Sequence, residues 1–193
     1  MLDGKTILIT GSSRGIGVAI AKLAKKYGAN VRLHGQSDSA KLRELSQKLC
    51  SSYVAFDVTD DKAVRREVAK LGQIDVLVNN AGVNPSKTFR QLSNADWQKI
   101  FDVNLFGPIN VSRAVLTSMK ERKSGSIVNI ASIKGFTHVA GKPAYASAKA
   151  ALIQLTTRMA EEFAPQGIRV NAVAPGPIVA PDNLAKLEGA IRQ

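Results

Sequence analysis

Residues 10–17 read Thr-Gly-Ser-Ser-Arg-Gly-Ile-Gly, between two stretches with different hydrophobic patterns. Residues 5–10 form a short β-branched and aliphatic run, typical of a buried strand. The residues that follow have the period of an amphipathic helix, with one face made of Ile16, Ile20, Leu23, Ala24 and Tyr27. A glycine-rich turn between a strand and a helix lets the backbone approach a diphosphate, whose charge the helix N-terminus stabilises. The three glycines Gly11, Gly15 and Gly17 therefore indicate a dinucleotide site in a Rossmann unit, the alternative being an ordinary turn.

Composition points to one globular domain over residues 1–193, since 45% of the residues are apolar. A single cysteine, Cys50, excludes an internal disulfide and a cysteine-based metal cluster, and two histidines leave little for a metal site. No apolar run is long enough to cross a bilayer, and the start of the chain lacks the pattern of a signal peptide. We therefore expect a cytoplasmic protein with no membrane segment and no metal.

The formal charge of +12 raises the alternative of a nucleic-acid-binding protein. The basic residues are, however, spread over many segments and have no interleaved aromatic residues. This distribution favours solvated helix faces and no nucleic-acid partner.

Strand and helix patterns alternate along the chain with short connections. Further strands are predicted over residues 31–34, 52–56, 75–79, 126–131 and 168–173, and further helices over 39–49, 60–71, 96–119 and 145–163. Ser93 and Asn94 are candidate caps of the long helix over residues 96–119. This alternation predicts an α/β fold: a Rossmann-like doubly wound parallel sheet in the order 3-2-1-4-5-6, with ligands at the carboxyl ends of the strands.

The end of the second predicted strand bears on which nucleotide binds. An acidic side chain at this place would bind the ribose hydroxyls of NAD, but the sequence reads His34-Gly35-Gln36-Ser37 with no acid before Asp38. Arg14 and Ser37 could instead hold the additional phosphate of NADP, the alternative for Arg14 being a solvated side chain. NADP(H) is favoured over NAD(H).

Tyr145 and Lys149 are four residues apart at the start of a predicted helix, so they share one face. An ammonium beside a phenol stabilises the phenolate, and we expect Lys149 to lower the pKa of Tyr145 toward that of a working acid or base. Taken alone, this spacing also fits a surface pair.

Seven motifs together make the chain resemble the short-chain dehydrogenase/reductases. They are Thr10 to Gly17, Asp57, Asn79-Asn-Ala-Gly82, Asn104, Ser132, Tyr145-x-x-x-Lys149 and Pro175-Gly176, in the order that the family has. The resemblance implies that Tyr145 is the general acid or base and that Ser132 donates a hydrogen bond to the substrate oxygen. It implies that Lys149 assists Tyr145 and holds the nicotinamide ribose, and that Asn104 positions a water in a proton relay.

The resemblance also implies a cofactor site. Asp57 would accept from the adenine amino group, while Asn79 would stabilise the central strand. The implied cofactor-binding residues are Gly11, Ser13, Arg14, Gly15, Ile16, Gly17, Ser37, Asp57, Val58, Asn80, Ala81, Gly82, Tyr145, Lys149, Pro175, Gly176 and Ile178.

The implied reaction is hydride transfer between a nicotinamide and a carbonyl or secondary alcohol. Within the family the chain looks most like 3-oxoacyl-acyl-carrier-protein reductases, in which case Lys120, Arg122 and Lys123 would dock an acidic acyl carrier at the active-site mouth. Against this, Gln166 stands where such enzymes often carry an arginine. The alternatives are a sugar or polyol dehydrogenase of the same family, or a truncated nucleotide-binding protein without turnover.

The chain departs from the family pattern after Gly176. Only 193 − 176 = 17 residues follow, residues 183–193 suggest a fragment of the substrate lid, and Ala180 replaces a cofactor-binding threonine. A seventh strand is not predicted. The resemblance implies a homodimer or homotetramer, with the two long helices as the dimer interface and the small residues Ala146, Ala148, Ala150 and Ala151 allowing close approach.

Overall fold

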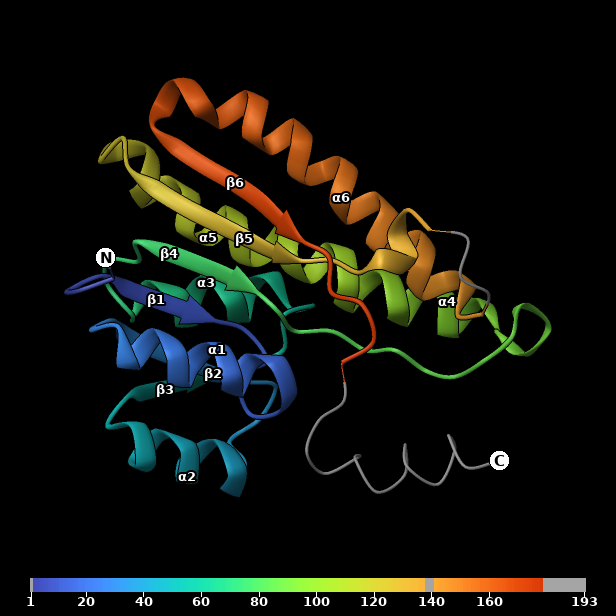
Figure 1. Cartoon of the computed structure of the whole chain (residues 1–193), viewed down its shortest axis with the longest axis horizontal. Helices are drawn as coiled ribbons and strands as arrows, with labels where there is room; N and C mark the ends of the chain where they lie inside the picture. Colours follow the sequence, from blue (N-terminus) through green and yellow to red (C-terminus); the bar gives the residue numbers. More distant parts are fainter. Residues whose placement is uncertain (1, 138–140, 179–193) are drawn as a thin grey trace.

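The computed structural model describes residues 2–137 and 141–178 of the chain. In these residues six strands form one parallel sheet in the order β3-β2-β1-β4-β5-β6, as predicted (Figure 1). The strands are β1 (Thr6–Ile9), β2 (Asn30–Gly35), β3 (Ser52–Ala55), β4 (Val76–Asn79), β5 (Gly125–Ile130) and β6 (Ile168–Val173). Among the described residues the sheet has these six strands and no seventh.

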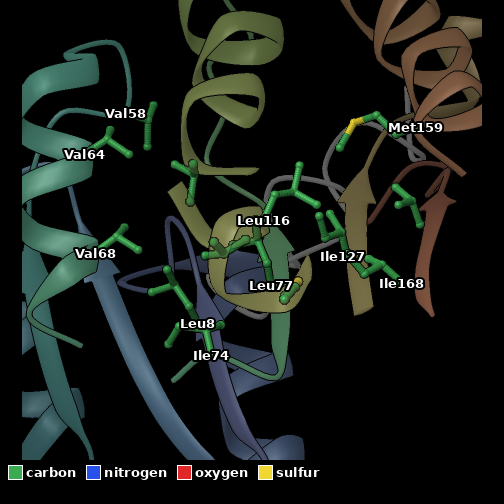
Figure 2. Close-up of a cluster of buried hydrophobic side chains, with 14 of the residues drawn as sticks. Leu8, Val58, Val64, Val68, Ile74, Leu77, Leu116, Ile127, Met159 and Ile168 are labelled. Carbon is green, nitrogen blue, oxygen red and sulfur yellow. The ribbon is translucent and has the colours of Figure 1, made fainter. Parts of the chain in front are cut away.

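Helices cover both faces of this sheet. They are α1 (Gly15–Lys26), α2 (Ala40–Leu49), α3 (Asp61–Ala69), α4 (Asn94–Phe101), α5 (Gly107–Glu121) and α6 (Pro143–Phe163), with a π-helix over Asp102–Phe106 and short 3-10 turns at Phe89–Gln91, Ile133–Gly135 and Ala164–Gln166. Successive residues of a strand point to opposite faces, so Leu8 packs in a core with α3, α5 and α6 (Figure 2). Ile7 and Ile9 pack on the other face with α1 and α2.

Polar caps fix where the helices begin. The sequence pattern predicted helices that begin at Ser39 and Asp60. In the structure each of these residues is instead the N-cap of its helix, because their side chains accept hydrogen bonds from the N–H groups of Leu42 and Ala63. Ser93, not Asn94, caps α4.

The single long helix predicted over residues 96–119 is wrong in one respect: a π-helix separates α4 from α5. Two side chains account for it. Pro108 has no N–H to donate to the carbonyl group of Asn104, four residues earlier. In addition, the side-chain Nδ2 of Asn104 donates to the carbonyl oxygen of Ile100 at 2.8 Å. The regular hydrogen-bond ladder is therefore interrupted around Asn104, and such π turns are frequent at functional sites.

The predicted apolar face of α1 is confirmed at Ala24 and Ile20, which pack in or against the core, and is wrong at Leu23 and Tyr27. The helix buries Gly17, Ala21 and Ala24, whereas Leu23 and Tyr27 are 54% and 56% exposed. Small residues face the sheet, which lets α1 lie close to it. The larger side chains line an apolar groove of about 570 Å³, together with residues of β1 and β4.

Candidate active site

A cavity of about 520 Å³ lies at the carboxyl ends of β4, β5 and β6. All four residues implied as catalytic line it: Asn104, Ser132, Tyr145 and Lys149. Of the implied cofactor residues, the cavity brings together Ile16, Asn80, Gly82, Tyr145, Lys149, Pro175, Gly176 and Ile178. The other implied cofactor residues do not line the cavity. Most of them lie in the glycine turn or just after β2 and β3, and Ala81 lies between the lining residues Asn80 and Gly82. Ala180 and residues 183–193 lie outside the described residues.

Tyr145 is half-buried in the first turn of α6, and Ser132 is the second residue after the end of β5. Burial raises the pKa of the Tyr145 phenol, and its hydrogen bond with Ser132 acts in the opposite direction without cancelling that rise. The predicted lowering of this pKa by Lys149 is therefore wrong. The Nζ atom of Lys149 lies 5.7 Å from the centroid of the Tyr145 ring, and desolvation of the phenol is the larger influence on its pKa.

Lys149 is buried, with 4% of its surface exposed. Its Nζ donates to the carbonyl oxygen of Ile130 at 2.7 Å, which ties α6 to the end of β5. Burial lowers the pKa of Lys149 to about 8. At pH 7 the side chain is still mostly protonated, so a positive charge stands one helical turn from Tyr145.

Asn104 is fully buried, and its side-chain amide is fixed at the π-helix. Nδ2 donates to the carbonyl oxygens of Val83 and Ile100, at 2.9 and 2.8 Å. Oδ1 has no hydrogen-bond partner among the described residues, and Asn104 is one of the residues that line the cavity. A Cβ on Gly82 would come within 2.8 Å of this oxygen, so Gly82 leaves room beside it. The π turn therefore presents a buried acceptor for a small polar group.

The glycine turn has the shape of a cradle for a diphosphate. A Cβ on Gly11 would lie 2.8 Å from Cα of Ala81, and one on Gly17 would lie 2.5 Å from the carbonyl oxygen of Gly11. Gly15 has a φ of +57°, in the region that glycine adopts without strain. The first turn of α1 has no acidic residue and no side-chain cap, so its N–H groups face the turn unpaired by side chains.

Thr10, which sequence analysis treated only as the start of the turn, joins it to β4. Its Oγ1 accepts from the N–H groups of Asn80 and Ala81, at 2.9 and 3.0 Å. In return, Nδ2 of Asn80 donates to the carbonyl oxygens of Thr10 and Gly11. Asn80 thus supports the turn with its side chain, beyond the cofactor contact that the resemblance implied.

Asp57 lies at the end of β3, beside the predicted adenine position. Although burial acts to raise its pKa, hydrogen bonds from Thr59 and Gln36 outweigh burial and the pKa is lowered. Asp57 is therefore an ionised acceptor at neutral pH. Ser37 and Arg14 are both exposed.

The basic cluster Lys120, Arg122 and Lys123 is not at the mouth of the cavity. It spans the last residues of α5 and the turn before β5, at the edge where the strands begin (Figure 1). The cavity lies at the opposite edge, at the carboxyl ends of the strands. The guanidinium of Arg122 donates to the carbonyl oxygen of Ile74 and to Ser118. Besides the buried Lys149, the basic residues that line the cavity are Lys134 and Lys142, both half-buried.

Two further results concern the described residues alone. None of their helices is long and apolar enough to cross a membrane. In the same part of the chain, acidic, histidine and cysteine side chains do not gather in groups of three or more.

Comparisons with known proteins identify the family of this chain. A family model described as short chain dehydrogenase matches residues 5–189. The chain is 39% identical over 185 residues to the 3-oxoacyl-[acyl-carrier-protein] reductase FabG of Chlamydia muridarum, covering 91% of this chain and 75% of that protein. It is 42% identical over 191 residues to the oxidoreductase UcpA of Salmonella typhimurium, covering 93% and 72%.

Among solved structures, a gluconate 5-dehydrogenase from Burkholderia cenocepacia in complex with NADP and tartrate superposes with a TM-score of 0.90 at 33% identity, covering 98% of this chain and 78% of that one. ElxO with NADP bound superposes with a TM-score of 0.90 at 32% identity, covering 97% and 79%. The chain belongs to the short-chain dehydrogenase family. As an enzyme it is an oxidoreductase that acts on CH–OH and C=O groups with NAD(P).

Proposed function

We propose that this enzyme uses NADP(H) to reduce a 3-oxoacyl thioester to the secondary alcohol. The observation that carries the proposal is the convergence of Ser132, Tyr145, Lys149 and Asn104 on one cavity beside the glycine turn. Conversion of a carbonyl group to an alcohol needs a hydride, a proton and stabilisation of the oxygen in between. NADPH, when bound, supplies the hydride.

Several features of the site fit a dinucleotide. The Gly11, Gly15 and Gly17 turn keeps side chains away from the place of the diphosphate, and the free N–H groups of α1 suit its charge. Asp57 would accept from the adenine amino group. Arg14 and Ser37 would contact the 2′-phosphate, and the absence of an acid before Asp38 leaves that phosphate without a like charge.

The side chains of the cavity would handle the proton and the oxygen. Ser132 would donate a hydrogen bond to the substrate oxygen while its negative charge grows. Tyr145 is protonated at neutral pH because its pKa is raised, so it has a proton to give to that oxygen. The Lys149 ammonium would stabilise the phenolate that remains. Oδ1 of Asn104 would accept from a water that returns a proton through Lys149.

The 3-oxoacyl thioester is proposed because of the FabG relatives and because Lys134 and Lys142 line the cavity, where their positive charge would attract an acidic carrier. A polyhydroxy ketone is the second candidate, favoured by the likeness to the gluconate 5-dehydrogenase. A homodimer or homotetramer in the cytoplasm is part of the same proposal.

The test is an assay of NADPH oxidation with a 3-oxoacyl thioester and, in parallel, with a polyhydroxy ketone, after intact mass has established which residues are present. Faster thioester reduction supports the proposal, and faster reduction of the polyhydroxy ketone replaces it with the second candidate. Binding of NADPH without turnover of either substrate would instead support a nucleotide-binding protein.

A further inference from the structure

His34 is a buried histidine that neither the catalytic set nor the implied cofactor set includes. It is the penultimate residue of β2, and 1% of its surface is exposed. The N–H group of Gly11 lies 3.0 Å from Nδ1 of His34, and Nε2 lies 2.9 Å from the carbonyl oxygen of Phe56. Because a backbone N–H can only donate, Nδ1 must be the acceptor. The neutral ring then carries its proton on Nε2 and donates it to Phe56.

The backbone of His34 holds the next residue of the turn as well. Ser12 N donates to the carbonyl oxygen of His34 at 2.9 Å, and the N–H group of His34 donates to Oγ of Ser12 at 2.8 Å. The ring also packs against Phe56, with centroids 4.1 Å apart. One residue thus joins the ends of β1, β2 and β3 at the start of the glycine turn.

We infer that His34 is a positioning residue whose neutral Nδ1 fixes the Gly11 amide and so holds the glycine turn in the conformation that binds the diphosphate of the dinucleotide. This inference rests on the proposed function. A protonated ring would place an N–H group against the N–H group of Gly11, two donors facing each other, and the turn would lose its anchor.

The surroundings of His34 keep the ring neutral. Burial lowers the pKa of His34 to about 4, and the hydrogen bond with Phe56 and the nearby charge of Asp57 offset only part of this effect. Asp57 is on the end of β3, while the charged side chain on the turn itself, Arg14, is exposed. Nδ1 of His34 therefore accepts the hydrogen bond from Gly11 throughout the neutral pH range, and it loses this ability only in acid, when the ring is protonated.

Two variants separate the two ring nitrogens. In His34→Asn the side-chain oxygen can take the place of Nδ1 and accept from Gly11. In His34→Gln the longer amide can donate to Phe56 in the place of Nε2 but offers no acceptor at the Nδ1 position. We expect the Kd of NADP+ at pH 7.5, measured by isothermal titration, to stay within about threefold for His34→Asn and to rise about tenfold or more for His34→Gln.

A shorter ligand separates positioning from general loss of structure. 2′-AMP has no diphosphate, so its affinity should be nearly equal in the wild type and in both variants. Equal NADP+ affinity in all three proteins, or an equal loss in both variants, overturns the inference. A parallel loss of 2′-AMP binding in His34→Gln also overturns it. If the wild type itself binds no NADP(H), the proposed function fails instead.

A measurement on the unmodified protein guards against a variant that does not fold. In ¹⁵N-labelled wild-type protein at pH 7, a scalar coupling across the hydrogen bond should join the Gly11 amide to Nδ1 of His34. The ring should show the Nε2–H form. A proton on Nδ1, or no coupling to Gly11, contradicts the inference.

Discussion

Burial acts on both titratable side chains at the start of α6. It raises the pKa of Tyr145 and lowers that of Lys149 to about 8, so each tends toward its neutral form. The sequence predicted the pair itself from the four-residue spacing, but it could not predict which effect dominates the phenol. Desolvation depends on what surrounds the ring in the folded chain, and no local pattern carries that information.

Tyr145→Phe should abolish most of the turnover. Removal of a general acid costs about 10²–10⁴-fold in kcat, while the ring and its packing remain. The Kd of NADP+ should change less than about threefold. A change of that size corresponds to less binding free energy than one hydrogen bond to a charged group contributes. Steady-state kinetics and isothermal titration measure the two quantities, and a large loss of NADP+ affinity would count against a purely chemical role.

Lys149→Met should stabilise the fold while it removes activity. Burying the ammonium costs free energy at pH 7, and a methionine of similar length avoids this cost but loses the hydrogen bond to Ile130. We expect the free energy of unfolding to rise by roughly 1–2 kcal/mol at pH 7.

The titration of Lys149 makes the free energy of unfolding depend on pH, in a direction that follows from its lowered pKa. Between the folded pKa of about 8 and the ordinary value of 10.5, the unfolded chain binds more protons than the folded one. The stability of the wild type therefore rises with pH through this window, and the advantage of Lys149→Met should shrink above pH 8 and reverse before the pH reaches about 10. Urea unfolding at several pH values measures this, and a constant difference would contradict the assignment.

The NADP preference is testable at Arg14 and Ser37. Arg14→Ala should weaken NADPH by about tenfold and leave NADH nearly unchanged, since only NADPH has the 2′-phosphate. Arg169→Ala removes the same charge from β6 and is the control. Comparable losses for both cofactors in Arg14→Ala would argue against the phosphate contact.

Ser37→Asp should shift the cofactor preference toward NADH. An aspartate at Gly35 would be less suitable for this test, because its Cβ would lie 3.0 Å from the side chain of Leu42.

At the scale of elements, the close packing of the glycine turn makes Gly17 sensitive to any side chain. Gly17→Ala would force a Cβ to within 2.5 Å of the carbonyl oxygen of Gly11 and 2.8 Å of Cα of Ser12. We expect a loss of a few kcal/mol in the free energy of unfolding and of most NADP+ affinity. Ala19→Ser, on the exposed side of the same helix, is the control. Thermal unfolding and isothermal titration measure the two losses. An unchanged melting temperature and NADP+ affinity in Gly17→Ala would show that the turn relaxes to accept the side chain.

Elements were predictable wherever a local pattern decides them. The six strands and the sheet order follow from alternating patterns and from the handedness of parallel connections. The π turn was not predictable from periodicity, because a single shifted hydrogen-bond register leaves most of the apolar pattern intact. His34 was missed for a related reason: a polar residue in a strand shows its role only when its partners, Gly11 and Phe56, come from other strands.

At the scale of the whole molecule, the predicted dimer face needs one correction. Ala148 is buried inside the chain with Ile100 and Ala144, so it cannot contact a second copy. Ala150 is exposed, and Ala146 and Ala151 are half-buried. Ala146, Ala150 and Ala151 therefore remain the predicted small residues of the dimer interface.

Ala150→Arg should therefore convert a dimer to a monomer by placing a long charged side chain on both sides of a two-fold interface. Gln47→Arg adds the same charge on the exposed face of α2 and should leave the dimer intact. Sedimentation velocity at micromolar concentration distinguishes the two, and a monomeric wild type would refute the interface altogether.

The place of β1 between β2 and β4 has a consequence for how the chain folds. Its pairing with β2 joins residues that are 30 − 6 = 24 positions apart, whereas its pairing with β4 joins Ile7 to Val76, 76 − 7 = 69 positions apart. Closing the longer loop costs more chain entropy, and distant contacts slow folding. The junction of β1 with β4, which Thr10 and Asn80 also cross-link, should therefore form after the first three strands have associated. The two halves of the cofactor site would meet only at that late step.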